Sequence, residues 1–290
     1  IEYLDFLKSA NVITHFDGNG SPVYNEAYLC FDPEERLYIN GRWQEGLIPN
    51  YGVPQKDKEQ ISRFLSEMQT FRLAKGIDGK DAFAIPVDQS SKDPVYSKLD
   101  TMTMKDWLLK EDLKSEYLHW YVNYCTRDDF GTNYDQCSAW AGVHYFAGRK
   151  GKAANADYSD VLTWPEGNGF LVKHLSNELQ KNIRTEMLVT KVEYAGDQVI
   201  VHYYDVKDQL LKEIVAEQCI IAVPQFIAGR LFNDQDRITA AKEKLQYVPW
   251  MVANIVTNKL EERSGESPSW DNVIYQSQSL GYVDATHQVL

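Results

Sequence analysis

The chain has few of the features that mark membrane, metal-binding or disulfide-rich proteins. No run of about 18 apolar residues occurs, so we expect no bilayer-spanning helix. The four cysteines, at 30, 125, 137 and 219, form no CxxC pair and predict neither a zinc site nor a disulfide framework. None of the six histidines lies in an HExxH arrangement. The expectation is an ordinary soluble protein without a bound metal, with Cys219 buried in the apolar run Cys219–Val223.

Basic residues are scarce relative to acidic ones. The 290 residues hold 30 Lys and Arg against 42 Asp and Glu, which gives a net charge of -12. Because binding to phosphates needs clustered Lys and Arg, nucleic acid is excluded as the main partner and a small-molecule substrate is favoured. The chain starts at Ile1 without a methionine, and Val289-Leu290 does not read as an ending. We therefore expect a fragment or a processed chain, whose compartment and oligomeric state the sequence does not indicate.

Aromatic residues are plentiful: 7 Trp, 18 Tyr and 11 Phe. They gather at residues 117–124 and 140–146, within two segments of helical character. Such groups suit a pocket for a flat or apolar ligand, or a platform for a sugar, and they equally suit core packing. On this basis Tyr121, Trp140 and His144 are candidates for lining a substrate pocket.

The periodicity of apolar residues predicts an α+β fold, with a helical region and an antiparallel or mixed sheet. Thr103 and Asp106 resemble a capping box, so a short helix should follow Thr103. Residues 28–39 are predicted to form a hairpin around Asp32-Pro33, and residues 76–100 a long loop. Further helices are predicted over 1–9, 55–75, 114–126, 136–148, 225–231 and 237–245. Strands are predicted over 186–194, 198–205, 211–223, 250–257 and 272–276.

Three short motifs occur in order in the middle of the chain. The first is Trp164-Pro165-Glu166-Gly167-Asn168-Gly169, followed by an apolar helical run. The second is Val189-Thr190-Lys191-Val192, a turn, and Val199-Ile200-Val201. The third runs from Ala216 to Ile221-Ala222-Val223-Pro224. Together they resemble the central part of flavin-containing amine oxidases and phytoene-desaturase-like enzymes, over roughly residues 160–225.

This resemblance implies FAD as the cofactor of the intact protein, and it assigns matched positions. In the family a strand valine offers main-chain groups to the adenine, and Val189 matches it. Ala222, Val223 and Pro224 match a strand end where small residues let the backbone approach the cofactor. Gly167 and Gly169 match the turn into a helix near the flavin ring, with Asn168 in place of a second glycine. The structural alternatives are that Val189 is an ordinary strand residue, that Pro224 only ends a strand, and that Gly167 and Gly169 form an ordinary helix-entry turn.

The sequence also departs from the family. No GxGxxG occurs, and the closing glycine-rich flavin motif is missing. We expect both to lie outside this chain, which alone should bind FAD weakly or not at all and be inactive. Many such oxidases place a Lys near the flavin, but the matching position here is Ala253 or Asn254. Trp250 and Asn254 are the candidates for lining the pocket on the flavin side, with core packing as the alternative for Trp250.

The resulting domain hypothesis has a mainly helical substrate region at 1–160, a cofactor-adjacent helix and β-meander at 161–235, and a return to the substrate-domain sheet at 236–290. The implied reaction is hydride transfer from a C–N or C–C bond to flavin. Two alternatives stay open: a cofactor-free protein that binds carbohydrate or aromatic ligands, and a non-catalytic interaction domain on a degenerate oxidase scaffold.

Overall fold

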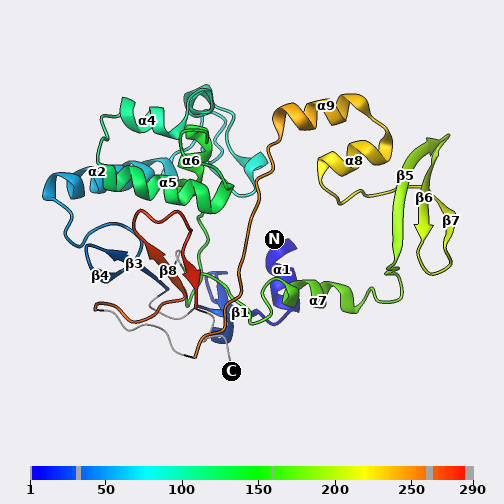
Figure 1. Cartoon of the computed structure of the whole chain (residues 1–290), viewed down its shortest axis with the longest axis horizontal. Helices are drawn as coiled ribbons and strands as arrows, with labels where there is room; N and C mark the ends of the chain where they lie inside the picture. The colour runs from blue at the N-terminus through cyan, green and yellow to red at the C-terminus, as the bar shows by residue number, and fades with distance from the viewer. Residues whose placement is uncertain (1, 31–33, 158–159, 259–263, 285–290) are drawn as a thin grey trace. The chain divides into compact units, whose positions relative to one another are not determined.

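The computed structural model describes residues 2–30, 34–157, 160–258 and 264–284 (Figure 1). Its contacts divide the chain into two compact units. The first unit comprises Ile1–Leu171 together with Trp250–Leu290, and the second comprises Val172–Pro249. The fold mixes helices and sheets, which agrees with the predicted α+β class. No helix in the described ranges is both long and apolar enough to cross a bilayer.

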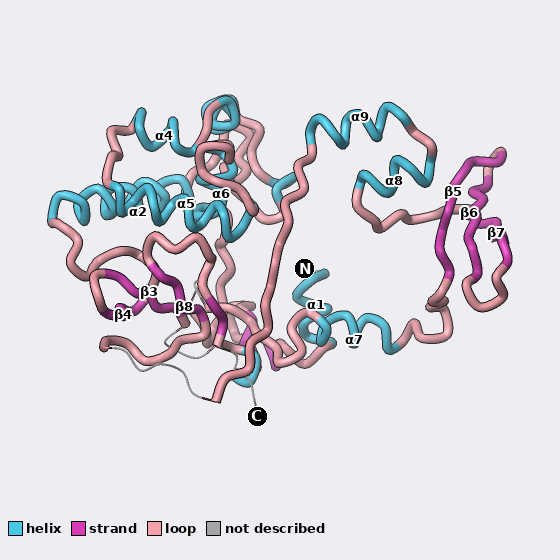
Figure 2. The backbone as a smooth tube through the Cα atoms, in the orientation of Figure 1, coloured by secondary structure: helices cyan, strands magenta, loops and turns pink. Residues whose placement is uncertain are grey.

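A helical layer forms the larger core of the first unit. Helix α2 (Gln55–Leu73) buries Ile61, Phe64 and Met68, whose spacing places them on one face. Helix α6 (Ala139–Ala147) packs against α2, α5 (Glu116–Phe130) and α4 (Met104–Lys110), as Figure 2 shows. The predicted helices 1–9, 55–75, 114–126 and 136–148 are confirmed to within a few residues, the first as α1 (Glu2–Ser9).

Local capping explains why these helices begin and end where they do. The Ser115 hydroxyl caps α5 by accepting from the Leu118 amide, and Gly131 ends the helix in the left-handed conformation at φ 64°. The Thr103 hydroxyl accepts from the Asp106 amide at 3.1 Å and donates to the Asp106 carboxylate at 2.8 Å. The predicted cap of α4 is thereby confirmed.

Replacing Thr103 with alanine should lower the free energy of unfolding by about 1 kcal/mol, because one amide of the first turn of α4 loses its acceptor. Thr103→Ser keeps the hydroxyl and is expected to stay within about 0.5 kcal/mol of the parent. Urea unfolding followed by circular dichroism measures both variants. Equal losses in the two variants would show that the methyl group of Thr103, and not its hydroxyl, contributes the stability.

A four-stranded sheet lies beneath α2 and α5 in the first unit (Figure 1). Its order is β4 (Arg42–Glu45), β3 (Glu35–Ile39), β8 (Asp271–Ile274) and β9 (Tyr282–Val283), with β3 and β8 parallel. Leu37, Ile39 and Val273 are fully buried against Tyr124 and Cys125 of α5. The strand predicted at 272–276 is confirmed as β8.

The hairpin predicted around Asp32-Pro33 is wrong. Strand β3 pairs instead with β4, and the turn is Asn40-Gly41, where both residues have positive φ. Asn-Gly is a strong signal for a two-residue hairpin turn, and it outweighs Pro33 here. Residues 31–33 themselves lie outside the described ranges, and Glu26–Tyr28 form a 3-10 turn before them.

Short elements complete the first unit. Strands β1 (Ile13–Phe16) and β2 (Pro22–Tyr24) pair beside α1, over a small core of Leu7, Val12, Ile13 and Trp164. The loop predicted at 76–100 contains three short helical turns: η2 (Val87–Gln89), α3 (Pro94–Ser97) and η3 (Lys98–Thr101). Helix α7 (Gly169–Asn177) follows Trp164 and runs from the first unit into the second.

The second unit is a β-meander with two helices. Strands β5 (Met187–Ala195), β6 (Gln198–Asp205) and β7 (Leu210–Ala216) pair antiparallel in chain order, followed by α8 (Gln225–Phe232) and α9 (Gln235–Lys244). The meander and both helices were predicted and are confirmed. Two details are corrected: the third strand ends at Ala216, short of Val223, and Cys219 is exposed.

The strand predicted at 250–257 is also wrong, because this segment has no regular secondary structure. Met251, Ile255 and Val256 are 92%, 79% and 100% exposed. A strand needs a neighbour for its backbone N–H and C=O groups, and no described strand pairs with this segment. The β-propensity of residues 250–257 is therefore not sufficient to form a strand.

Candidate functional site

Val189 lies where a main-chain contact to a ligand is feasible. It belongs to β5, which pairs with β6 along one side only; no described strand pairs with its other side. A bulge interrupts the pairing between Val189 and Lys191. Val189 is partly exposed at 36%, and Leu188 is 63% exposed. An edge strand presents unpaired backbone groups, and the contact between Val189 and the adenine stays a prediction.

The matched positions Ala222, Val223 and Pro224 follow β7 in irregular backbone of the same unit. Ala222 is exposed, Val223 is 39% exposed, and Pro224 immediately precedes α8. Helix α8 packs against β5, with the rings of Tyr194 and Phe232 6.4 Å apart. The third family motif therefore does not form a strand in the described fold. Its residues do lie between the meander and a helix.

Gly167 and Gly169 lie in the turn before α7. Gly167 has φ 56° and has open space where a Cβ would stand, and Gly169 is the first residue of α7. The rings of Trp164 and Phe170 on either side stack 5.6 Å apart at 8°. This stack anchors the turn to the small core and leaves the glycine backbone at the surface.

Trp250 and Asn254 lie outside the cleft that the second unit forms between β5, β6 and β7. Trp250 is 58% exposed and Asn254 is exposed, in the segment that lacks regular structure. Their assignment to the flavin side of a pocket stays a prediction.

The three candidate pocket residues on α5 and α6 separate into two ring clusters. Trp140 stacks on His144 with ring centres 5.1 Å apart and packs on Phe83 at 5.5 Å. Tyr121 instead packs on Phe146 and belongs to the core around Cys125. The described contacts do not bring Tyr121 together with the other two residues.

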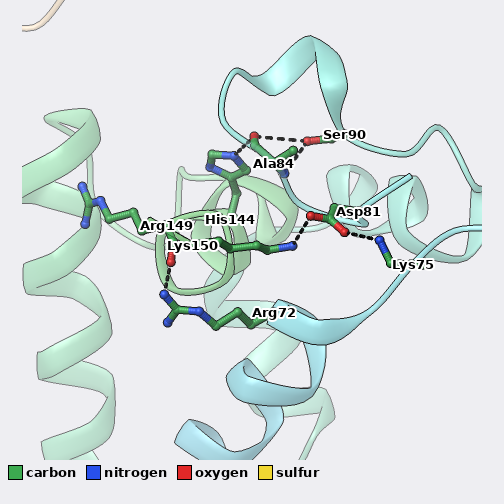
Figure 3. Close-up of polar contacts among 8 residues, drawn as sticks. All are labelled: Arg72, Lys75, Asp81, Ala84, Ser90, His144, Arg149 and Lys150. Atoms are coloured by element: carbon green, nitrogen blue, oxygen red, sulfur yellow. Dashed lines mark hydrogen bonds and ion pairs between the residues drawn. The ribbon is translucent and has the colours of Figure 1, made fainter. Parts of the chain in front are cut away.

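His144 has a structural partner, which Figure 3 shows. Its Nε2 lies 2.8 Å from the carbonyl oxygen of Ala84, whose amide donates to the Ser90 hydroxyl at 2.8 Å. The imidazole thus ties α6 to the loop before α3. Trp140 stacks on the ring of His144, and Ala84 occupies its Nε2.

Basic side chains beside His144 fasten the same loop (Figure 3). Lys75 and Lys150 reach the Asp81 carboxylate at 2.8 Å and 3.1 Å, and Arg72 donates to the carbonyl of Arg149. Hydrogen bonds from Lys75 and then Lys150 hold the pKa of Asp81 below its usual value. Arg72 lies in the last turn of α2, and Lys75 and Lys150 follow the C-terminal ends of α2 and α6, where the helix dipole favours positive charge.

Two features of the first unit escaped sequence reasoning. Arg36 is 4% exposed and lies 3.9 Å from the Trp43 ring centre, with donors to segment 266–282. Glu35, Asp128 and Asp271 form an acidic cluster between α5 and the start of the parallel strands β3 and β8. Their positions in the chain lie too far apart for any local pattern to connect them.

The acidic cluster has perturbed pKa values. Burial, then the charges of Asp271, Glu34 and Asp128, raise the pKa of Glu35 to about 7. Burial also raises the pKa of Asp271 to about 6, although the Tyr124 hydroxyl donates to its carboxylate at 3.3 Å. Perturbed carboxylates occur at functional sites and in structural networks alike. Among the described residues no group of three or more His, Cys, Asp or Glu is placed to hold a metal ion.

A shallow cleft of about 430 Å³ opens at the bulge of β5. It is lined by Thr190, Lys191, His202, Leu211, Lys212 and Glu213. The imidazole Nε2 of His202 lies 2.8 Å from the Glu193 carboxylate, and Lys212 contacts Asp205 at 2.8 Å. The charged side chains that line this cleft therefore have oppositely charged partners within the sheet. The cleft shows no preference for an anionic or a cationic ligand.

Comparison with known proteins bears on the fold alone. No protein-family model and no curated protein sequence matches the chain. Among solved structures, the chain is similar to a triple mutant of putrescine oxidase with redesigned cofactor binding. The TM-score is 0.52 at 13% identity, over 79% of this chain and 46% of that one. The chain thus has a fold similar to part of an amine-oxidising enzyme, and it spans about half the length of that protein.

Proposed function

We propose that this chain is part of an FAD-dependent oxidoreductase of the amine-oxidase type, which oxidises a C–N or C–C bond by hydride transfer to the flavin. The observation that carries the proposal is the ordered motif set, Gly167-Asn168-Gly169, Val189 and Ala222-Val223-Pro224, on a fold similar to part of a putrescine oxidase. A helix-entry turn and a meander follow one another in the order of the resemblance, whereas the strand that should end at Pro224 is not formed.

The residues present fit a supporting role toward the cofactor. Val189 lies on a strand edge whose other side has no described partner strand, and Ala222 is small and exposed. Exposed small residues let a backbone approach a flat ligand closely. FAD would supply the redox chemistry, while these residues would position it and help to exclude water. The chain alone should bind FAD weakly, since no glycine-rich nucleotide-binding loop occurs in its sequence.

A spectrum of the full-length protein that contains this sequence tests the proposal. We expect the visible absorbance bands of oxidised flavin, and their bleaching when a substrate is added without oxygen. Ala222→Leu should lower flavin affinity about tenfold or more by blocking close approach, which corresponds to about 1.4 kcal/mol.

The matched control is Ala240→Leu, an exposed alanine on α9 in the same unit, which should leave flavin affinity unchanged. Both alanines are exposed, so neither change should affect folding by more than about 0.5 kcal/mol. A colourless full-length protein that takes up no added FAD would refute the proposal.

The aromatic rings of the helical core do not favour carbohydrate binding as a second function. Phe64, Phe71, Phe83 and Trp107 pack edge to face within the helical core, and Phe64 and Phe83 are fully buried. Rings used in this way offer no platform to a sugar.

A further inference from the structure

The bulge in β5 begins directly after Val189. Val189 pairs with Tyr203 of β6. The next pair joins Lys191 to His202, which leaves Thr190 as an extra residue in the ladder. A bulge of this kind bends its strand and increases the local twist. The direction of β5 therefore changes immediately beyond the position that the family resemblance matches to the adenine contact.

Side chains on both strands fix the bulge in place. The Thr190 hydroxyl donates to the His202 carbonyl at 3.3 Å, across the ladder. The His202 ring is held by carboxylates of both flanking strands, with Nε2 2.8 Å from Glu193 and Nδ1 3.7 Å from Glu213. Thr190, Lys191 and His202 line the cleft together, so both bulge residues place their side chains on one face of the sheet. The bulge is thus a defined part of the meander.

The bulge lies on a strand whose second edge has no described partner strand. Leu188 and Val189, which precede it, are both exposed. The ring contact between β5 and α8 is at Tyr194, near the other end of the strand. Bulges are over-represented beside active sites, where they redirect a strand, and on edge strands, where they hinder pairing with another chain. These two roles predict different consequences when the bulge is removed.

We propose that the bulge at Thr190 positions the main chain of Val189 for the adenine end of FAD. Thr190 is then a positioning residue, which acts through the backbone of its neighbour. This inference rests on the proposed function and adds to it a residue to which the resemblance assigns no role. All residues involved belong to the second unit. A regular ladder would keep Val189 in β5 but would turn its exposed edge in a different direction.

Deletion of Thr190 tests the proposal with little other disturbance. The two pairs that flank the bulge would then follow one another in a regular antiparallel ladder, and every other side chain would keep its face. We expect a melting temperature close to that of the parent, because the deleted residue has no partner residue in the ladder. The apo form of the full-length protein that contains this sequence should bind FAD about tenfold or more weakly, measured by quenching of flavin fluorescence. ADP, which carries the adenine end alone, should compete with FAD less well by a similar factor.

Substitutions at Thr190 separate its hydroxyl from the extra residue. Thr190→Val removes the hydrogen bond to the His202 carbonyl and should weaken FAD binding about threefold. Thr190→Ser keeps the donor and should bind FAD as the parent does. The matched control is Thr239→Val, at an exposed position on α9 of the same unit, which should leave the affinity unchanged.

The FAD affinity and the oligomeric state of the variants decide between the two roles. A folded deletion variant with the FAD affinity of the parent would overturn the positioning role. The same affinity together with self-association in size-exclusion chromatography would assign the bulge to protection of the strand edge, which also overturns it. If the deletion variant does not fold, an unchanged affinity of Thr190→Val refutes the proposal. A full-length parent that binds no FAD refutes the proposed function itself, which differs from equal binding by parent and variants.

Discussion

The Arg36→Ala variant is expected to lose about 3 to 5 kcal/mol of unfolding free energy, enough to leave the first unit largely unfolded. The guanidinium is 4% exposed and donates to the Glu266 carbonyl at 2.8 Å, the Tyr282 hydroxyl at 2.9 Å and the Asn272 side chain. It also lies against the Trp43 ring. Alanine would remove all three hydrogen bonds, one of them to the fully buried Asn272, and open a cavity between β3 and the segment around β8.

The measurement is thermal and urea unfolding of the purified chain, with Arg42→Ala as the control. Arg42 is exposed on β4 and contacts the Tyr51 ring at 4.9 Å, so its loss should cost less than about 1 kcal/mol. Arg36→Lys should be intermediate, because an ammonium keeps the charge but not the planar fork that reaches three acceptors. Equal stability of the Arg36 and Arg42 variants would show that the Arg36 contacts make no net contribution to the free energy of unfolding.

Helices in this chain could be predicted from the sequence because their signals are local. The cap at Thr103, the left-handed Gly131 and the apolar spacing of α2 each act over one or two turns. The meander was equally readable, since its turns at Gly196-Asp197 and around Asp208-Gln209 separate strands of high β-propensity.

What the sequence could not reveal depends on distant partners. The parallel pairing of β3 with β8 joins Leu37 to Val273, and no short pattern encodes it. The segment 250–257 shows the converse, because its residues favour a strand but no described strand pairs with them. For the candidate site, motifs could name Val189 and Ala222, but composition alone could not show that His144 is already bonded to Ala84.

The acidic cluster should make the first unit less stable as pH rises from about 4 to 7. The folded pKa values of Asp271, about 6, and Glu35, about 7, lie above the unfolded values near 4. Between those limits the folded state binds more protons than the unfolded state, so unfolding free energy falls with pH. The full stability is present at about pH 4, and the loss is complete once the pH exceeds about 7.

Other carboxyls titrate in a different window. Hydrogen bonds hold the pKa values of Asp78, Asp81 and Asp112 below the ordinary value of 3.8. Their contribution is present above that value and is lost only as pH falls below it. Acid unfolding through these groups therefore does not overlap the effect of the acidic cluster above about pH 5.

Variants of the cluster test this pH dependence. Glu35 is exposed by surface area although burial is the main cause of its raised pKa, so we expect a smaller effect from Glu35 than from half-buried Asp271. Asp271→Asn should stabilise the chain at pH 8 by about 1 to 2 kcal/mol, after allowance for solvent screening, and by roughly half as much at pH 5. Glu35→Gln should flatten the same profile more weakly, whereas Glu45→Gln, at an exposed position on β4, should leave it unchanged. If the chain instead becomes more stable between pH 5 and 8, or if Asp271→Asn keeps the slope of the parent, burial and charge repulsion in the cluster do not raise the pKa values of its carboxyls.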